Sequence, residues 1–297
     1  MNTATRGWIN GMIGVSIFSG SLPATRLAVL GLDPLFVTAA RAALAGLLAL
    51  AVLALTRGPR PARADLRTLL LVALGVVVGF PLLTALALRT ITSAHSLVFI
   101  GLLPLATALF GTWLGGERPV RAFWMFAILG AASVVGFAFS RDGSGSLGAD
   151  ALMMAAIVSC GYGYAEGARL SRQLGGWQVI CWVLVLSLPV SLPLAVLLRP
   201  AVWTSIAVSA WGGLAYVTVF SMLVGFVFWY RGLALGGIAA VGQLQLLQPF
   251  MGLMLAAWLL GEPVTPAMLV VTAFVVACVA GARYTAAAPA TASGAAH

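Results

Sequence analysis

Residues 243–263 read QLQLLQPFMGLMLAAWLLGEP, an apolar run that carries three glutamines and a proline and ends at Gly-Glu-Pro. The run is long enough to cross a lipid bilayer, which takes about 20 residues of helix. Residues 104–119, PLATALFGTWLGGERP, have the same layout. In both copies the proline precedes the glutamate by the same 13 residues (Pro104 to Glu117, Pro249 to Glu262). This repetition predicts a duplicated membrane unit.

The composition fits a membrane protein and no other class. Hydrophobic residues make up 62% of the 297 residues and charged residues only 8%, whereas soluble domains are about 25% charged. A soluble protein this apolar would expose large hydrophobic patches to water. With about 20 residues in each spanning helix, the chain has room for about ten spans. We therefore expect an all-α integral membrane protein.

Composition also excludes several functions. All 16 basic residues are Arg, which excludes mechanisms that need a lysine, such as P-loop NTPases and Schiff-base enzymes. The net charge of +9 comes from arginines scattered among the loops, and this indicates membrane topology rather than nucleic-acid binding. The three cysteines lie in apolar segments without CxxC spacing, so we expect buried thiols, no metal and no cofactor.

Apolar runs recur along the whole chain and predict ten transmembrane helices. Their approximate ranges are 7–25, 34–55, 68–88, 90–116, 122–140, 149–168, 178–198, 207–230, 238–260 and 265–283. The Gly/Ser-rich stretch RDGSGSLGAD separates the first five from the last five. We therefore expect a first repeat at 1–140, an inter-repeat loop at 141–150, a second repeat at 151–284 and a disordered tail at 285–297.

Landmark residues support the duplication because they recur at fixed offsets. The offset is 145 in the later spans and 143 in the first spans (Pro104/Pro249, Gly116/Gly261, Glu117/Glu262, Val134/Val279, Gly136/Gly281; Gly20/Gly163, Arg26/Arg169). Eleven arginines fall on the side that holds both termini and four on the other, so both termini should be cytoplasmic. Since five spans is an odd number, the second repeat would enter the membrane inverted. Such 5+5 inverted-topology repeats bind solutes near the bilayer midplane and work by alternating access.

Several segments resemble the EamA family of the drug/metabolite transporter superfamily. In that family a first helix of small residues precedes a Gly-x-x-Pro turn and an arginine in the second helix, as in residues 18–49 with Arg41. Residues 104–136 and 249–281 resemble its proline, apolar helix, Gly-Glu and Gly-rich helix. The resemblance implies ten helices and export of metabolites across the bacterial inner membrane. One branch, the YddG type, exports aromatic and other amino acids. The family often has Trp where this chain has Phe18, which leaves the branch open.

Polar side chains within spans are candidate substrate ligands because lipid makes them costly. Gln245 and Gln248 share one helix face, where amides could bind a zwitterion or link neighbouring helices. Pro249 would free a backbone carbonyl near residue 245. Arg41 lies seven residues into its span, about 10 Å deep, so it should face protein or a cavity. It would bind a carboxylate or act structurally, and we assign Arg41, Pro104 and Pro249 structural or gating roles.

Two further clusters are candidates for substrate binding. Tyr162 and Glu166 share a face in the sixth span, and Glu166 would either contact a substrate amine or proton, or form a helix-end salt bridge with Arg169. His95 begins the fourth span as a cavity-mouth ligand, a gate or a solvated helix end. Phe99 lies one turn deeper, to stack on a substrate ring or simply to pack.

These observations predict a secondary transporter that exports small organic metabolites, foremost aromatic or other apolar amino acids. A multidrug or other metabolite exporter of the same fold is the alternative. A channel or an intramembrane enzyme fits less well, since the spans carry no HExxH, GxSxG or paired aspartates. The expected partners are a small-molecule substrate, the lipid bilayer and protons, without nucleic acid, in a monomer or dimer. Two glycine pairs should pack helices closely (Gly75/Gly79, Gly111/Gly115).

Overall fold

The computed structural model describes residues 3–58, 60–115, 121–139, 146–236, 241 and 243–287. This part of the chain is helical and holds no strand. Its α-helices are α1 (Thr3–Ser19), α2 (Ser21–Gly31), α3 (Pro34–Thr56), α4 (Leu66–Val72), α5 (Phe80–Ala87), α6 (Ser93–Ile100), α7 (Leu103–Gly115), α8 (Arg121–Phe139), α9 (Leu147–Leu174), α10 (Gly176–Leu197), α11 (Val208–Tyr216), α12 (Gly225–Gly236), α14 (Gln248–Leu260) and α15 (Pro266–Ala287). Shorter segments are the 3-10 helices η1 (Arg63–Asp65) and η4 (Gln243–Leu247) and the π-helices η2 (Ala73–Gly79) and η3 (Val217–Val224).

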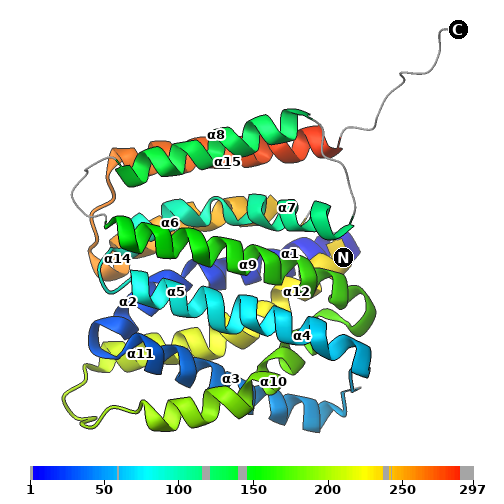
Figure 1. The fold of residues 1–297 in the computed structure, drawn as a ribbon, viewed down its shortest axis with the longest axis vertical. Coiled ribbons are helices and arrows are strands. Elements are labelled where there is room, and N and C mark those ends of the chain that lie inside the picture. Colours follow the sequence, from blue (N-terminus) through cyan, green and yellow to red (C-terminus); the bar gives the residue numbers. More distant parts are fainter. Residues whose placement is uncertain are drawn as a thin grey trace, which may run out of the picture.

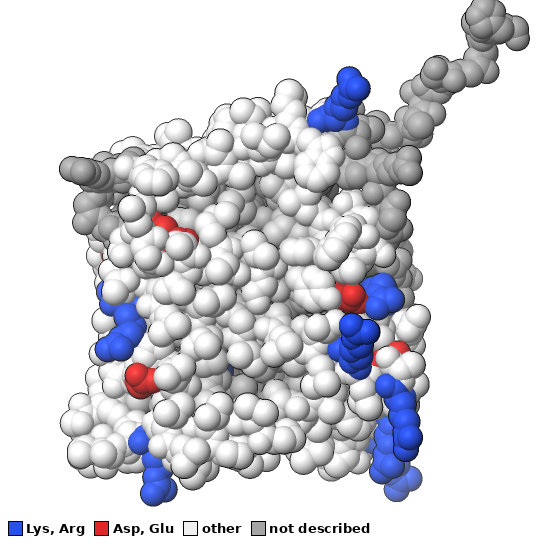
Figure 2. All heavy atoms as spheres, in the orientation of Figure 1, with Lys and Arg blue, Asp and Glu red and all other residues white. Residues whose placement is uncertain are grey.

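The helices have the lengths and the surface of a membrane bundle. Seven of the described helical stretches are long and apolar enough to span a bilayer, and three shorter apolar stretches accompany them (Trp124–Phe139, Leu244–Leu260, Pro266–Gly281). The helices lie side by side in a stack that runs from α8 and α15 at one end to α3 and α10 at the other (Figure 1). Charged side chains gather along the two sides of the molecule at which the helices end, and the surface between these two sides is largely uncharged (Figure 2). The expectation of an all-helical, multi-pass membrane protein is confirmed.

Corresponding segments of the two halves make corresponding contacts. The helix α3 packs along α10, and α8 packs along α15. The helix α1 packs on α12, and its counterpart α9 packs on η2 and α5. The two π-helices, η2 and η3, also occupy corresponding positions in their halves. The described helices are therefore paired as a duplicated unit would pair them.

Three spans that the sequence predicts as single helices are interrupted. Gly20 separates α1 from α2, the turn at 101–102 separates α6 from α7, and η4 precedes α14. Pro104 and Pro249 each occupy the second position of a new helix, α7 and α14. A proline fits there because the first turn of a helix needs no N–H donor. The prolines therefore start helical segments instead of kinking continuous ones.

Two expected boundaries also differ. The helix α9 begins at Leu147, inside the stretch 141–150 that was expected to be a loop, because an acidic residue in its first turn, Asp150, favours a helix start there. The helix α15 extends to Ala287, into the expected tail, and residues 288–297 lie outside the described part. Gly116 and Glu117, the first copy of the Gly-Glu pair, also lie outside it.

One of the two glycine pairs allows helices to approach closely. A Cβ on Gly75 would lie 2.8 Å from the carbonyl oxygen of Ser159 and 2.9 Å from Cα of Gly163. A Cβ on Gly79 would lie 2.0 Å from Oγ of Ser159. By contrast, a Cβ on Gly111 would meet no atom within 4 Å, so the packing role predicted for that residue is wrong.

We therefore expect Gly75→Ala to destabilise the protein and Gly111→Ala to leave it at least as stable as the wild type. The methyl group at residue 75 would push η2 away from α9 and cost about 1–3 kcal/mol, as overpacking does. The methyl group at residue 111 meets open space and raises helix propensity by about 1 kcal/mol. Thermal unfolding of the two purified variants in one detergent measures the difference, and equal losses of stability would contradict the close contact.

Candidate functional site

The structure encloses a cavity of about 30 Å³ between the two halves. Six polar or ionisable side chains line it: Ser21, Arg41, Cys160, Tyr164, Ser221 and Gln248. They come from α2, α3, α9, η3 and α14, so both halves contribute. This volume holds one or two water molecules, so an organic solute can enter only when the surrounding helices move apart.

Arg41 is the buried cation of this cavity. Its side chain lies on α3 and is only 4% exposed. The Nε atom is buried without a hydrogen-bond partner. None of the three ion pairs found among the described residues includes Arg41. The arginine expected to have a structural or gating role thus stands in the cavity wall, and no described residue compensates its charge.

The two glutamines that were candidate substrate ligands, Gln245 and Gln248, have different surroundings. Gln248 is the first residue of α14 and lines the cavity. Gln245 belongs to η4, is 5% exposed and is not among the lining residues. Its Nε2 atom is buried without a partner. Across the cavity wall, Ser21 and Ser221 share a hydrogen bond of 2.8 Å between their Oγ atoms, which links α2 of one half to η3 of the other.

Aromatic rings pack together beside the cavity, on the side toward the end of α12. Phe226 lies at the centre, with its ring centroid 5.1 Å from that of Phe18 and 5.9 Å from that of Tyr164. Tyr230 extends the cluster, with its ring 5.4 Å from Phe226. Phe18, Tyr164 and Phe226 all line the cavity. This aromatic cluster, formed by these four residues, gives the cavity an apolar wall on that side.

At the other end, Glu262 joins the two halves through the N-terminus of α6. Its carboxylate accepts hydrogen bonds from the backbone N–H groups of Ser93 (3.1 Å) and Ala94 (2.8 Å) and from Oγ of Ser93 (2.7 Å). Gly261 makes this possible because it ends α14 in the left-handed region, with φ +62°, which glycine adopts without strain. The carboxylate also complements the positive end of the helix dipole.

Further polar residues surround this contact. We call the whole set the polar latch and define it as Arg26, Glu262, Ser93, His95 and Asp150. Nε of Arg26 lies 3.9 Å from Oε1 of Glu262, and its Nη1 donates to the carbonyl of Leu88. Nε2 of His95 lies 2.8 Å from Oδ1 of Asp150, which stands in the first turn of α9. The latch therefore ties α6 to α2, to α9 and to the end of α14.

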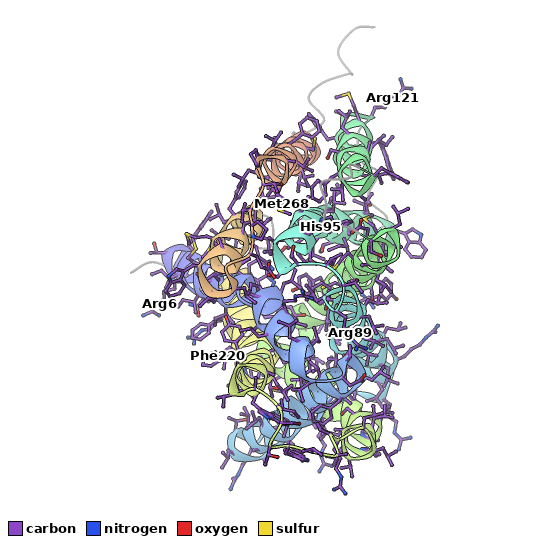
Figure 3. The ribbon with its side chains drawn as sticks, turned by 90° about the vertical axis from the view of Figure 1, so that its left-hand side faces the viewer. Arg6, Arg89, His95, Arg121, Phe220 and Met268 are labelled. Carbon is purple, nitrogen blue, oxygen red and sulfur yellow. The ribbon has the colours of Figure 1, made fainter. Side chains whose placement is uncertain are left out.

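His95 is not a solvated helix end. Its side chain is 4% exposed and packs against the rings of Phe137 and Phe99, whose centroids lie 4.7 Å and 5.8 Å away. In a view along the helices His95 lies inside the bundle, whereas Arg121 and Phe220 lie at its periphery (Figure 3). Phe99 is 1% exposed and packs on His95, and neither residue is among those that line the cavity.

Tyr162 and Glu166 lie away from the lining set. The ring of Tyr162 packs edge-on against Phe110 of α7, with 5.4 Å between their centroids. Glu166 is 5% exposed and accepts a hydrogen bond of 3.0 Å from Nε of Arg169. Arg169 itself is 54% exposed, so this pair is the helix-end salt bridge weighed from the sequence.

Sequence reasoning missed the lining residues Cys160 and Tyr164, which flank Tyr162 on the same helix. It also missed Asp150, because that residue fell in an expected loop. An acidic residue in the first turn of an apolar helix was the available signal. Among the described residues no group of three or more His, Cys, Asp or Glu side chains could hold a metal ion.

A multi-pass bundle with a cavity lined by both of its similar halves is an architecture typical of membrane transporters. The chain belongs to the EamA-like transporter family, whose model matches residues 5–139 and again residues 147–284. It is 62% identical over 283 residues to the "Uncharacterized transporter YdeK" of Bacillus subtilis (strain 168), covering 95% of this chain and 99% of that protein. A solved structure described as "Crystal structure of protein" shares the fold with a TM-score of 0.62 at 20% identity, covering 95% of this chain and 98% of that one.

We expect Glu262→Gln to loosen the contact between the halves. The amide keeps the shape of the side chain but loses the charge that strengthens three hydrogen bonds, so stability should fall by about 1–3 kcal/mol. The control is Asp65→Asn, a half-buried carboxylate outside the contact between the halves that accepts only a 3.2 Å bond from the N–H of Ala62. Thermal unfolding in detergent compares them. A Glu262→Gln protein as stable as the control would show that the latch carries no energy.

Proposed function

We propose that this protein is a secondary transporter that exports small organic metabolites across the bacterial inner membrane by alternating access. Solutes with an apolar or aromatic body, amino acids among them, are the proposed substrates. The observation that carries the proposal is the cavity lined by residues of both halves, Arg41 and Gln248 among them. A site between two repeats is where a carrier binds a solute before it releases that solute to one side of the membrane.

The proposed topology is ten spans in a 5+5 inverted repeat, with both termini cytoplasmic. Its support is the pairing of α3 with α10 and of α8 with α15, which places each of these helices against its own counterpart. Such self-pairing is expected for two units related by a two-fold axis. The arginine asymmetry between loops gives the orientation. In that orientation the polar latch lies at the periplasmic end and the aromatic cluster at the cytoplasmic end.

During alternating access, either the polar latch or the aromatic cluster would open while the other stays formed. Opening outward breaks the bonds of Glu262 to α6 and the pair between His95 and Asp150. Opening inward separates the ring of Phe18 from the ring of Phe226. The contacts of Glu262 with α6, of His95 with Asp150 and of Phe18 with Phe226 join segments from different halves, so a rocking of the halves breaks them as a group. A channel fits less well, because a cavity of about 30 Å³ is too small to form a continuous pore.

The multidrug alternative has less support for cationic drugs. Such solutes carry positive charge, and the lining residues include Arg41 but no carboxylate. Moving a cation beside an uncompensated guanidinium is unfavourable at low dielectric.

Counterflow in proteoliposomes tests the proposed function. Vesicles loaded with an unlabelled solute should accumulate the same solute in labelled form, because a carrier exchanges and a channel does not. The panel should contain apolar and aromatic amino acids, organic acids and amines. We expect Gln248→Ala to lower exchange by about 2- to 10-fold, the effect of one hydrogen bond. Gln173→Ala, on the exposed end of α9, should leave it unchanged. Folded protein that exchanges no member of the panel would overturn the proposal.

Protons are the proposed coupling ion, carried by His95 with Asp150 or by Glu166. All three groups are buried: His95 lies on α6 and contacts Asp150 in the first turn of α9, and Glu166 lies further along α9. In the double variant His95→Ala/Glu166→Gln, uptake driven by an imposed pH gradient should disappear, while counterflow without a gradient should persist. Full pH-driven uptake by the double variant would rule out both groups as proton carriers.

A further inference from the structure

The charge and the helix ends around the central cavity define the chemistry of its ligand. We propose that Arg41 binds a carboxylate of the transported solute, and that the cavity requires this anionic group but not an amine. The substrates would be small monocarboxylates with an apolar or aromatic body. This inference rests on the proposed transport function and adds the chemical class of the solute.

The first observation is the unpartnered guanidinium. Arg41 is 4% exposed, it lines the cavity, and its Nε has no partner. Burying a cation without a counter-ion is costly, and water in a cavity of about 30 Å³ can satisfy its hydrogen bonds without neutralising its charge. A bound carboxylate would satisfy the hydrogen bonds and also neutralise the charge, because a guanidinium presents paired N–H donors that match two carboxylate oxygens.

The second observation is independent of Arg41. Two helices of 13 residues begin at the cavity: α7 at Leu103 and α14 at Gln248, and both of these residues line it. The N-terminus of a helix carries a positive partial charge and favours anions. Since the two starts occupy corresponding positions in the two halves, both dipoles favour an anion in the same cavity.

The remaining lining residues indicate which other chemical groups the solute carries. Among the residues that line the cavity there is no aspartate or glutamate to pair with an ammonium group. Phe18, Phe80 and Phe226 supply an apolar wall for a ring or an alkyl chain. The solute therefore needs a carboxylate and an apolar body, while an amine gains no ionic partner.

Four ligands with one phenyl ring and a short chain separate these requirements: 3-phenylpropionate, phenylalanine, 3-phenylpropionamide and phenethylamine. Binding to the full-length protein in detergent is measured by calorimetry or ligand-induced stabilisation. We expect 3-phenylpropionate to bind at least as tightly as phenylalanine. The amide and the amine should bind about 10- to 100-fold more weakly, the value of a charge-assisted hydrogen bond. Wild-type protein that binds the amide or the amine as tightly as the carboxylates would overturn the proposal.

Variants provide the second arm. Arg41→Gln should lose about 10- to 100-fold in affinity for both carboxylates and leave the amide unchanged, and Arg41→Lys should keep part of the affinity. Arg89→Gln removes the same charge from an exposed position and should bind like the wild type. If Arg41 were purely structural, Arg41→Gln would lower the affinity for all four ligands alike.

If Arg41→Gln fails to fold, the order of affinities of the four ligands for the wild-type protein still tests the proposal. A protein that exchanges other solutes but binds no carboxylate disproves this inference alone, whereas one that exchanges nothing disproves the proposed function.

Discussion

Lipid cannot form hydrogen bonds with a peptide group, and this constraint decides where a spanning helix can be interrupted. Among the described residues, the interruptions at Gly20 and Leu102 fall at buried positions, and α14 begins at the buried Gln248. Protein groups supply the missing partners there, as where the hydroxyl of Tyr216 donates to the carbonyl of Ile17 at 2.8 Å. Irregular backbone is thereby confined to the surroundings of the cavity, where helix ends can serve a ligand.

The same environment sorts the charges. Glu262 lies beside Arg26 and accepts three hydrogen bonds from α6, and His95 is paired with Asp150, so these buried groups stabilise a contact between halves. Arg41 has no such partner and contributes a cost instead. A protein of this kind keeps such a cost where a ligand offsets it. In the proposed mechanism the paired charges hold one conformation, and the unpaired charge of Arg41 attracts the solute.

Much of the fold could be predicted from the sequence, because apolar length, prolines and the Gly-Glu repeat are local signals. These signals also indicated Gln248, which begins α14 and lines the cavity, as a candidate site residue. The face of a long helix that meets the cavity could not be predicted locally. Tyr162 and Glu166 share a face, but contacts of α9 with α5 and α7 turn Tyr164 to the cavity instead. The polar latch could not be predicted because its bonds join residues that are far apart in the sequence. Ser93 and Glu262, for example, are 169 positions apart.

The π-helices η2 and η3 add a mechanical property to the cavity wall. Val76 in η2 and Ser221 and Met222 in η3 line the cavity, and Phe80 and Phe226 follow within two residues of these segments. A π-helix holds an extra residue relative to an α-helix. Conversion of either segment to an α-helix would turn the half-helix after it by roughly 100° and shift it by about 1.5 Å. Such a screw motion would carry a phenylalanine out of the wall and enlarge the cavity without tilting any helix in the bilayer.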